Sequence, residues 1–146
     1  MWNLSRRDEI WGRGTNEMVI EIPLLTIPKK NSQQIVWNSK THRPFIRQSE
    51  RYLLFERECG LFLGKYQNNI TCPVNIKATF YVPDKRKRDL TNLENSIADI
   101  LVKYKVIEDD NYNVLQSWDG SRIIYEKGRQ ETILEIEEVA NDMSRL

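Results

Sequence analysis

The sequence contains few of the residues that bind zinc or form disulfides. It has one histidine, His42, and two cysteines, Cys59 and Cys72, which lie in unrelated local contexts and form no CxxC motif. The usual zinc ligand sets need several cysteines or histidines at short spacings, so we expect no zinc site. A disulfide framework is also not expected, and a reducing cytoplasmic setting is the default for such a chain.

Long apolar runs and an excess of one charge are missing as well. No apolar run approaches the roughly 20 residues that cross a membrane. Residues 1–16 have scattered charges and lack the apolar block of a signal peptide. Lysine and arginine number 22 against 21 acids, for a net charge of +1. We therefore expect no membrane partner, and a nucleic-acid role would depend on how the charges are arranged.

The 146 residues, 40% of them hydrophobic, fit one folded domain. We interpret residues 1–16 as an N-terminal arm and residues 17–146 as the domain. Residues 18–28 are rich in β-branched and apolar side chains and predict a strand. Residues 29–45 are polar and turn-prone and predict a long loop, and loops of that length are often functional.

Two helices and further strands follow. Apolar residues recur at near-helical spacing after Ser49, which is a plausible N-cap, and the pattern stops at Gly64. Residues 74–83 alternate as a half-buried strand does. A second amphipathic helix is expected from about Asn92 to Lys105, capped by Thr91.

The last third of the chain predicts short strands around Val114, at 123–125 and at 133–136, with a hairpin turn at Asp119-Gly120. The whole pattern predicts a single α+β domain with about four or five strands and two helices.

Four consecutive cations, Lys85, Arg86, Lys87 and Arg88, precede the second helix, and Asp89 follows them. Cations of this kind hold phosphodiester backbones by charge and hydrogen bonds. A solvated turn is the alternative interpretation, and composition alone favours it.

Acids also follow the second helix, where Glu108, Asp109 and Asp110 are consecutive. Carboxylates are the natural ligands of Mg²⁺, which activates water and stabilises charge on a phosphate. An ordinary polar turn is again the alternative.

A helix of about 14 residues is roughly 20 Å long, so Asp89 and Asp110 start at opposite ends of it. Five extended residues return at most about 17 Å. The two acids meet if the chain doubles straight back, if the helix is short, or if a second subunit supplies one of them. Asp99, in mid-helix, is either a hydrogen-bonding residue of the helix face or part of the site. Trp37 in the long loop either packs partly buried or stacks on a base. His42 in the same loop is either an exposed polar contact, which could touch DNA, or a general base.

The segment "PDKRKRDLTNLENSIADILVKYKVIEDDNYNV" resembles the signature region of the RusA family of Holliday junction resolvases. Upstream, "LTIPKKNSQQ" is similar to the family's first strand and loop, and "TILEIEE" is similar to its last strand. The resemblance covers roughly residues 20 to 138. The matching positions are Pro83, Asp84, the basic run, Arg88-Asp89-Leu90, Asn92-Leu93, Asp99 and Asp109-Asp110.

The resemblance implies a homodimeric fold with a mixed sheet and a Mg²⁺-dependent crossover junction endodeoxyribonuclease. Such enzymes cut four-way DNA junctions in recombination and repair by paired symmetric nicks, one from each subunit. Carried over by position, Asp89 and Asp110 are the catalytic acids and bind the metal together with Asp109. The DNA-binding stretch is Lys85, Arg86, Lys87 and Arg88.

Two positions depart from the family pattern. Thr91 stands where the family has a second acid, and Asn95 stands where it has a lysine. Threonine is a poor substitute for an anionic metal ligand, and the lysine would stabilise charge on a phosphate. The alternative functions are therefore a junction-binding protein of the same fold that cuts weakly or not at all, and an interaction domain with no nucleic-acid role.

Overall fold

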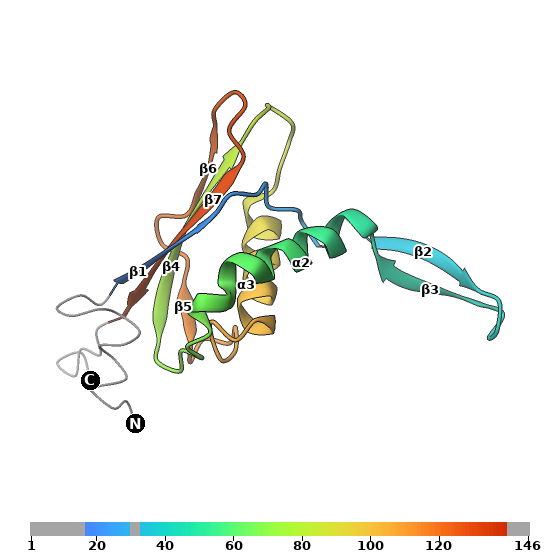
Figure 1. Ribbon diagram of the computed structural model, residues 1–146, viewed down its shortest axis with the longest axis horizontal. Helices are drawn as coiled ribbons and strands as arrows, with labels where there is room; N and C mark the ends of the chain where they lie inside the picture. Colours follow the sequence, from blue (N-terminus) through green and yellow to red (C-terminus); the bar gives the residue numbers. More distant parts are fainter. Residues whose placement is uncertain (1–16, 30–32, 140–146) are drawn as a thin grey trace.

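The computed structural model describes residues 17–29 and 33–139, so the arm proposed for residues 1–16 lies outside the described residues. The described chain forms a mixed sheet of five strands with two helices on one face, and a separate two-stranded sheet projects from it (Figure 1). The expected α+β class, with two helices and about five strands in the main sheet, is confirmed. No helix in these two stretches is long and apolar enough to cross a membrane.

Strand β4 (Val74–Val82) is the centre of the sheet. On one side it pairs antiparallel with β7 (Glu131–Glu138), which in turn pairs antiparallel with β1 (Glu17–Ile22). On the other side, β5 (Leu115–Ser117) pairs with the beginning of β4 and β6 (Arg122–Tyr125) with its end, both parallel to it.

The hairpin predicted at Asp119-Gly120 is wrong. β5 and β6 do not pair with each other, because they run in the same direction and follow one another along the edge of β4. Between them the Ser121 hydroxyl accepts a hydrogen bond from the Ala78 N–H (2.9 Å) and contacts the Ile76 carbonyl (3.2 Å). One side chain thus satisfies backbone groups that neither short strand reaches.

The core lies between the sheet and the helices. Alternate residues of β1, β4 and β7 point toward the helices, as the period of two requires, and their neighbours point away. The largest fully buried side chains come from both layers: Ile20, Ile22, Ile76 and Phe80 from the sheet, Tyr52 and Leu63 from the first helix, and Leu93, Ile97, Ile100 and Leu101 from the second.

Helix α2 (Glu50–Leu63) begins after Ser49, whose hydroxyl accepts the Tyr52 N–H at 3.2 Å, so the expected cap is confirmed. A 3-10 turn, η2 (Gly64–Tyr66), follows it. Helix α3 (Leu90–Lys103) starts two residues before the predicted bound. Its cap is Asp89 and not Thr91, because the Asp89 carboxylate accepts the Thr91 N–H at 2.9 Å.

The two helices approach each other closely at Gly60. The Tyr104 hydroxyl donates to the Glu56 carbonyl of α2 at 2.9 Å. A Cβ atom on Gly60 would lie 2.6 Å from the ring carbons of Tyr104. Glycine is therefore required here because the Tyr104 ring leaves no room for a side chain, and not because of the backbone conformation.

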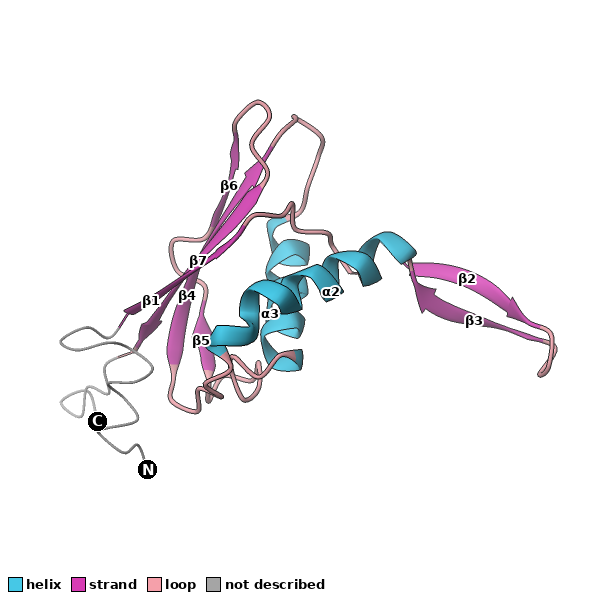
Figure 2. Cartoon of the chain, in the orientation of Figure 1, coloured by secondary structure: helices cyan, strands magenta, loops and turns pink. Residues whose placement is uncertain are grey.

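Most of the segment predicted as a long loop is instead a β-hairpin, formed by β2 (Gln33–Asn38) and β3 (Arg43–Gln48). It projects away from the two layers (Figure 2). Polar residues at both ends and a turn-rich centre hide two short strand-forming runs, Ile35–Trp37 and Phe45-Ile46.

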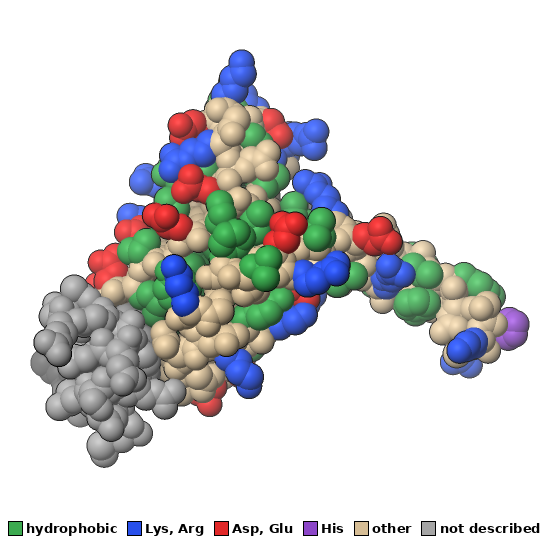
Figure 3. All heavy atoms as spheres, viewed as in Figure 1, with side chains coloured by type: hydrophobic (Ala, Val, Ile, Leu, Met, Phe, Trp, Pro, Cys, Tyr) green, Lys and Arg blue, Asp and Glu red, His purple; other side chains and the backbone are tan. Residues whose placement is uncertain are grey.

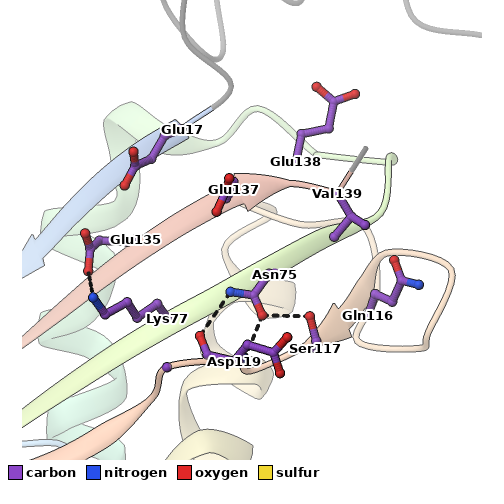
Figure 4. A pocket seen from close by; sticks show the side chains of 11 residues that line it. Glu17, Asn75, Lys77, Gln116, Ser117, Asp119, Glu135, Glu137, Glu138 and Val139 are labelled. Atoms are coloured by element: carbon purple, nitrogen blue, oxygen red, sulfur yellow. Dashed lines mark hydrogen bonds and ion pairs between the residues drawn. The ribbon is translucent and has the colours of Figure 1, made fainter. Parts of the chain in front are cut away.

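The face of the sheet that points away from the helices is acidic. Figure 4 shows Glu17, Glu135 and Glu137 on this face, around a shallow hollow. Lys77 from β4 offsets part of the charge, with its Nζ 3.6 Å from a Glu135 carboxylate oxygen. Glu21 and Glu131 extend the same face along β1 and β7.

Candidate functional site

The loop from β4 to α3 carries the basic run and is organised by Asp84. Its carboxylate accepts from Arg88 Nη1 at 2.9 Å and from the Arg86 N–H at 3.0 Å. The Arg88 guanidinium, helped by the Arg86 N–H, holds the pKa of Asp84 below its usual range. Arg88 also lies within 3.3 Å of the carbonyls of Asp84 and Arg86 and is only 15% exposed. Arg88 therefore braces the loop from within.

The other three cations of the run, Lys85, Arg86 and Lys87, are exposed. Lys85 lies over the Tyr125 ring, with its Nζ 5.3 Å from the ring centroid. Figure 3 shows lysine and arginine side chains gathered at this end of the molecule. Arg86 also pairs with Asp84, with its Nε 3.9 Å from a carboxylate oxygen. All three side chains are accessible to phosphates, and their DNA-binding role stays a prediction.

Asp89 lies at the entrance of α3. It borders a hollow, called here the Asp89 hollow, that is lined by Pro28, Lys87, Arg88, Asp89, Asn92 and Leu93. One carboxylate oxygen caps the helix, and the side chain as a whole is exposed. An exposed carboxylate beside two cations can take part in binding a metal and a phosphate together.

Asp110 lies at the other end of α3. The chain doubles back there, because the Glu108 N–H donates to the Ile70 carbonyl at 2.9 Å beside a short parallel bridge between Ile70 and Ile107. Asp110 borders a second hollow, the Asp110 hollow, lined by Lys29, Glu56, Asp99, Val102, Lys103 and Asp110.

The charge on Asp110 is disfavoured by its surroundings. Partial burial raises the pKa of Asp110, and its carboxylate neighbours Asp109 and Asp99 raise it further. The Asp110 N–H donates to Asp109 at 2.7 Å, and hydrogen bonds of this kind lower the pKa of Asp109. Across the stretches that the structure covers, no lysine or arginine pairs with Asp110.

The other two acids of the Asp110 hollow each have a lysine partner. Lys29 Nζ lies 3.4 Å from Asp99, and Lys103 pairs with Glu56. The sequence leaves Asp99 open between two roles, and the structure places it beside Asp110. No local pattern indicates Lys29 or Glu56, because each reaches the hollow from a distant segment.

A single chain keeps Asp89 and Asp110 in separate hollows. Asp89 and Asp99 are ten residues apart, which is about 15 Å along a helix axis. Pro28 borders the Asp89 hollow and its neighbour Lys29 borders the Asp110 hollow. The Ser96 hydroxyl fixes this segment by donating to the Ile27 carbonyl at 2.6 Å. The described part of one chain holds no group of three acidic, histidine or cysteine side chains close enough to bind a metal.

The residues present still suit Mg²⁺, because this ion takes only one or two protein carboxylates and keeps several waters. Asp110 and Asp99 share a hollow, and their mutual repulsion would be relieved by a divalent cation. Asp89 offers a further exposed carboxylate.

A scan against protein-family models and a search of curated proteins both find no match. Its function must therefore be inferred from its residues and their geometry.

Proposed function

We propose that this chain is a RusA-like, Mg²⁺-dependent endonuclease that resolves four-way DNA junctions by paired symmetric nicks. One observation carries the proposal: exposed cations lead directly into Asp89 at the start of α3, and Asp110 folds back onto the same helix beside Asp99. Cations suited to holding phosphate thus precede α3, and carboxylates suited to a metal flank it, which supports a role in phosphodiester hydrolysis.

In this mechanism, Lys85, Arg86 and Lys87 hold the DNA backbone next to the Asp89 hollow. Asp89 and Asp110 would hold Mg²⁺, with Asp109 beside them. When bound, Mg²⁺ supplies a water of lowered pKa and neutralises charge on the scissile phosphate. Asp109 also fixes the turn, since its oxygens accept from the Asp110 N–H and the Asn111 amide (2.9 Å).

The proposal includes a homodimer, and the separation of the two hollows supports it. A gap of about 15 Å along α3 is too long for one ion to bridge. Asp89 of one subunit beside Asp110 of the other would supply the missing carboxylate. Two such sites in a symmetric dimer would also give two nicks related by the symmetry of the junction.

The test is an end-labelled four-way junction incubated with the protein, in Mg²⁺ or in EDTA. We expect paired nicks in Mg²⁺ only, and none from Asp89→Asn at equal concentration. Absence of nicks from folded wild-type protein at every concentration would refute the enzymatic proposal.

A second candidate is a junction-binding protein that does not cut, and Thr91 favours it. Thr91 is exposed in the first turn of α3, two residues from Asp89, where a carboxylate would complete the acidic set. This candidate predicts tight binding without nicks, and a gain of cleavage in Thr91→Asp. A Thr91→Asp variant that binds and still does not cut would contradict this explanation.

A further inference from the structure

The β2–β3 hairpin stands outside the two layers of the domain (Figure 1). Its strands pair with each other and with no strand of the main sheet. All residues of β3 except Gln48 are exposed. An isolated hairpin is only marginally stable in water, so contact with another molecule would stabilise an exposed one of this kind.

One face of the hairpin is apolar. The register sets Ile35 opposite Ile46 and Trp37 opposite Pro44, so all four side chains lie on the same face. Ile35 is 81% exposed, Ile46 67% and Trp37 62%. These are the side chains that a protein uses to wedge between bases or to cover another apolar surface.

The charge of the hairpin indicates which of these two partners, bases of a nucleic acid or another apolar protein surface, its apolar face contacts. Residues 33–48 carry Lys40, Arg43 and Arg47 and no acid, in a chain whose acids and bases are nearly equal in number. Two copies of a purely cationic arm repel each other where they meet, whereas phosphates attract it. The composition therefore favours a nucleic acid over a second copy of the chain.

The tip of the hairpin is held in one conformation. The Asn38 side-chain oxygen accepts from the N–H groups of Lys40 (2.9 Å) and Thr41 (3.3 Å). The His42 N–H donates to the Asn38 carbonyl at 2.8 Å. A preformed tip loses little conformational entropy on binding.

We infer that this hairpin enters the open centre of the four-way junction, where Trp37 stacks on a base at the branch point. Bases at a branch point have faces without a stacking partner, and a tryptophan ring covers such a face well. Pro44 and Ile46 extend the apolar contact, and Lys40 and Arg43 bind the phosphates that converge there. This role rests on the proposed junction-resolving function. It explains how a protein with that function would recognise a branch point.

The experiment compares a synthetic four-way junction with a linear duplex of the same arm sequence, both in EDTA so that neither is cut. We expect Trp37→Ala to weaken junction binding about tenfold, the size of one base-stacking contact, and duplex binding less than about twofold. Trp37→Phe should retain most of the affinity. Leu61→Ala, which removes an exposed apolar side chain from α2, is the matched control and should bind as the wild type does.

Salt dependence tests the cations independently. Lys40→Gln and Arg43→Gln should each reduce the slope of log K against log salt by about 0.9, the value for one lost phosphate contact. Unchanged slopes in both variants would contradict the assignment.

The outcomes separate this inference from the function on which it rests. Wild-type protein that binds no junction overturns both. If the wild type and Trp37→Ala bind the junction equally tightly, the role of the hairpin is overturned and the proposed function is not. If Trp37→Ala lowers the sedimentation coefficient of the protein, the apolar face is a contact between copies, which also overturns the role of the hairpin.

Discussion

Asp110 bears a carboxylate where its charge is costly, and we expect its removal to separate activity from stability. Asp110→Asn should reduce junction cleavage by about 100-fold, because the proposed metal site would lose a ligand. The same change should leave stability at neutral pH equal or higher, since it removes an exposed carboxylate that is repelled by Asp109 and Asp99. Cleavage assays and urea unfolding measure the two effects.

The sign with pH follows from the raised pKa of Asp110. The Asp110 charge destabilises the folded state at pH values above the pKa of the folded protein, and this cost disappears below the pKa of the unfolded chain. The free energy of unfolding of the wild type therefore rises as the pH falls from the first pKa to the second. Asp110→Asn should not show this gain. Glu108→Gln, an exposed acid two residues away, is the control. A clearly less stable Asp110→Asn at pH 7 would contradict this account.

The four consecutive cations should also divide into two roles. Arg88→Gln should lower the melting temperature, because Arg88 braces the loop through Asp84. Lys87→Gln should leave melting unchanged and weaken junction binding, with a salt slope lower by about 0.9. Equal effects of the two variants on melting would refute the distinction.

The pH dependence of this brace has the opposite sign to that of Asp110. The pKa of Asp84 is lowered in the folded protein, so its stabilisation is present above the unfolded value and is lost as pH falls through the folded one. The melting difference between wild type and Asp84→Asn should therefore be present at pH 7 and shrink once the pH falls below about 3.8. Asp119→Asn, another turn acid, serves as the control.

At the scale of elements, the contact between α2 and α3 depends on Gly60. Gly60→Ala should destabilise the fold, because the new methyl group displaces the Tyr104 ring from its hydrogen bond with Glu56. Overpacking of this kind costs about 1–3 kcal/mol. In a Tyr104→Ala background the same change should instead stabilise by about 1 kcal/mol, since alanine is the better helix former. Chemical denaturation of the wild type, the two single variants and the double variant decides it. Equal signs of the Gly60→Ala effect in both backgrounds would contradict the packing explanation.

The elements with a clear period were predictable from sequence. Helix α2, strand β4 and most of α3 follow from apolar residues at regular spacing, and Ser49 from its capping chemistry. The β2–β3 hairpin was not, because both of its faces are exposed and so impose no alternation on the sequence. The parallel placement of β5 and β6 was also missed, since Asp119-Gly120 marks a turn but not the partner of each strand.

The acids of the candidate site on either side of α3 were predictable from the sequence, whereas their arrangement and the neighbours Lys29 and Glu56 were not. Asp89, Asp109 and Asp110 are recognisable by spacing around a helix. Asp110 lies beside Asp99 and Glu56, and away from Asp89. This position depends on the bridge between Ile70 and Ile107, a contact between distant segments that local sequence patterns do not reveal.

At the scale of the whole molecule, mixed dimers test whether Asp89 and Asp110 meet across subunits. Co-expressed, differently tagged Asp89→Asn and Asp110→Asn chains form a dimer in which one cross-subunit site keeps both acids. We expect this dimer to make single nicks in a four-way junction, while each parent variant makes none. An inactive mixed dimer of confirmed composition would show that the acids do not act in trans.

The acidic face of the sheet, with Glu17, Glu21, Glu131, Glu135 and Glu137, lies on the side of the molecule away from the cationic hairpin (Figure 1). Over the residues that the structure describes, this opposite placement of charge makes the molecule an electric dipole. Near a polyanion such a dipole experiences a larger torque than net attraction. It therefore turns its hairpin toward the polyanion before any contact forms. Ions that shorten the Debye length would remove this alignment, so at high salt encounters would become randomly oriented as well as weaker.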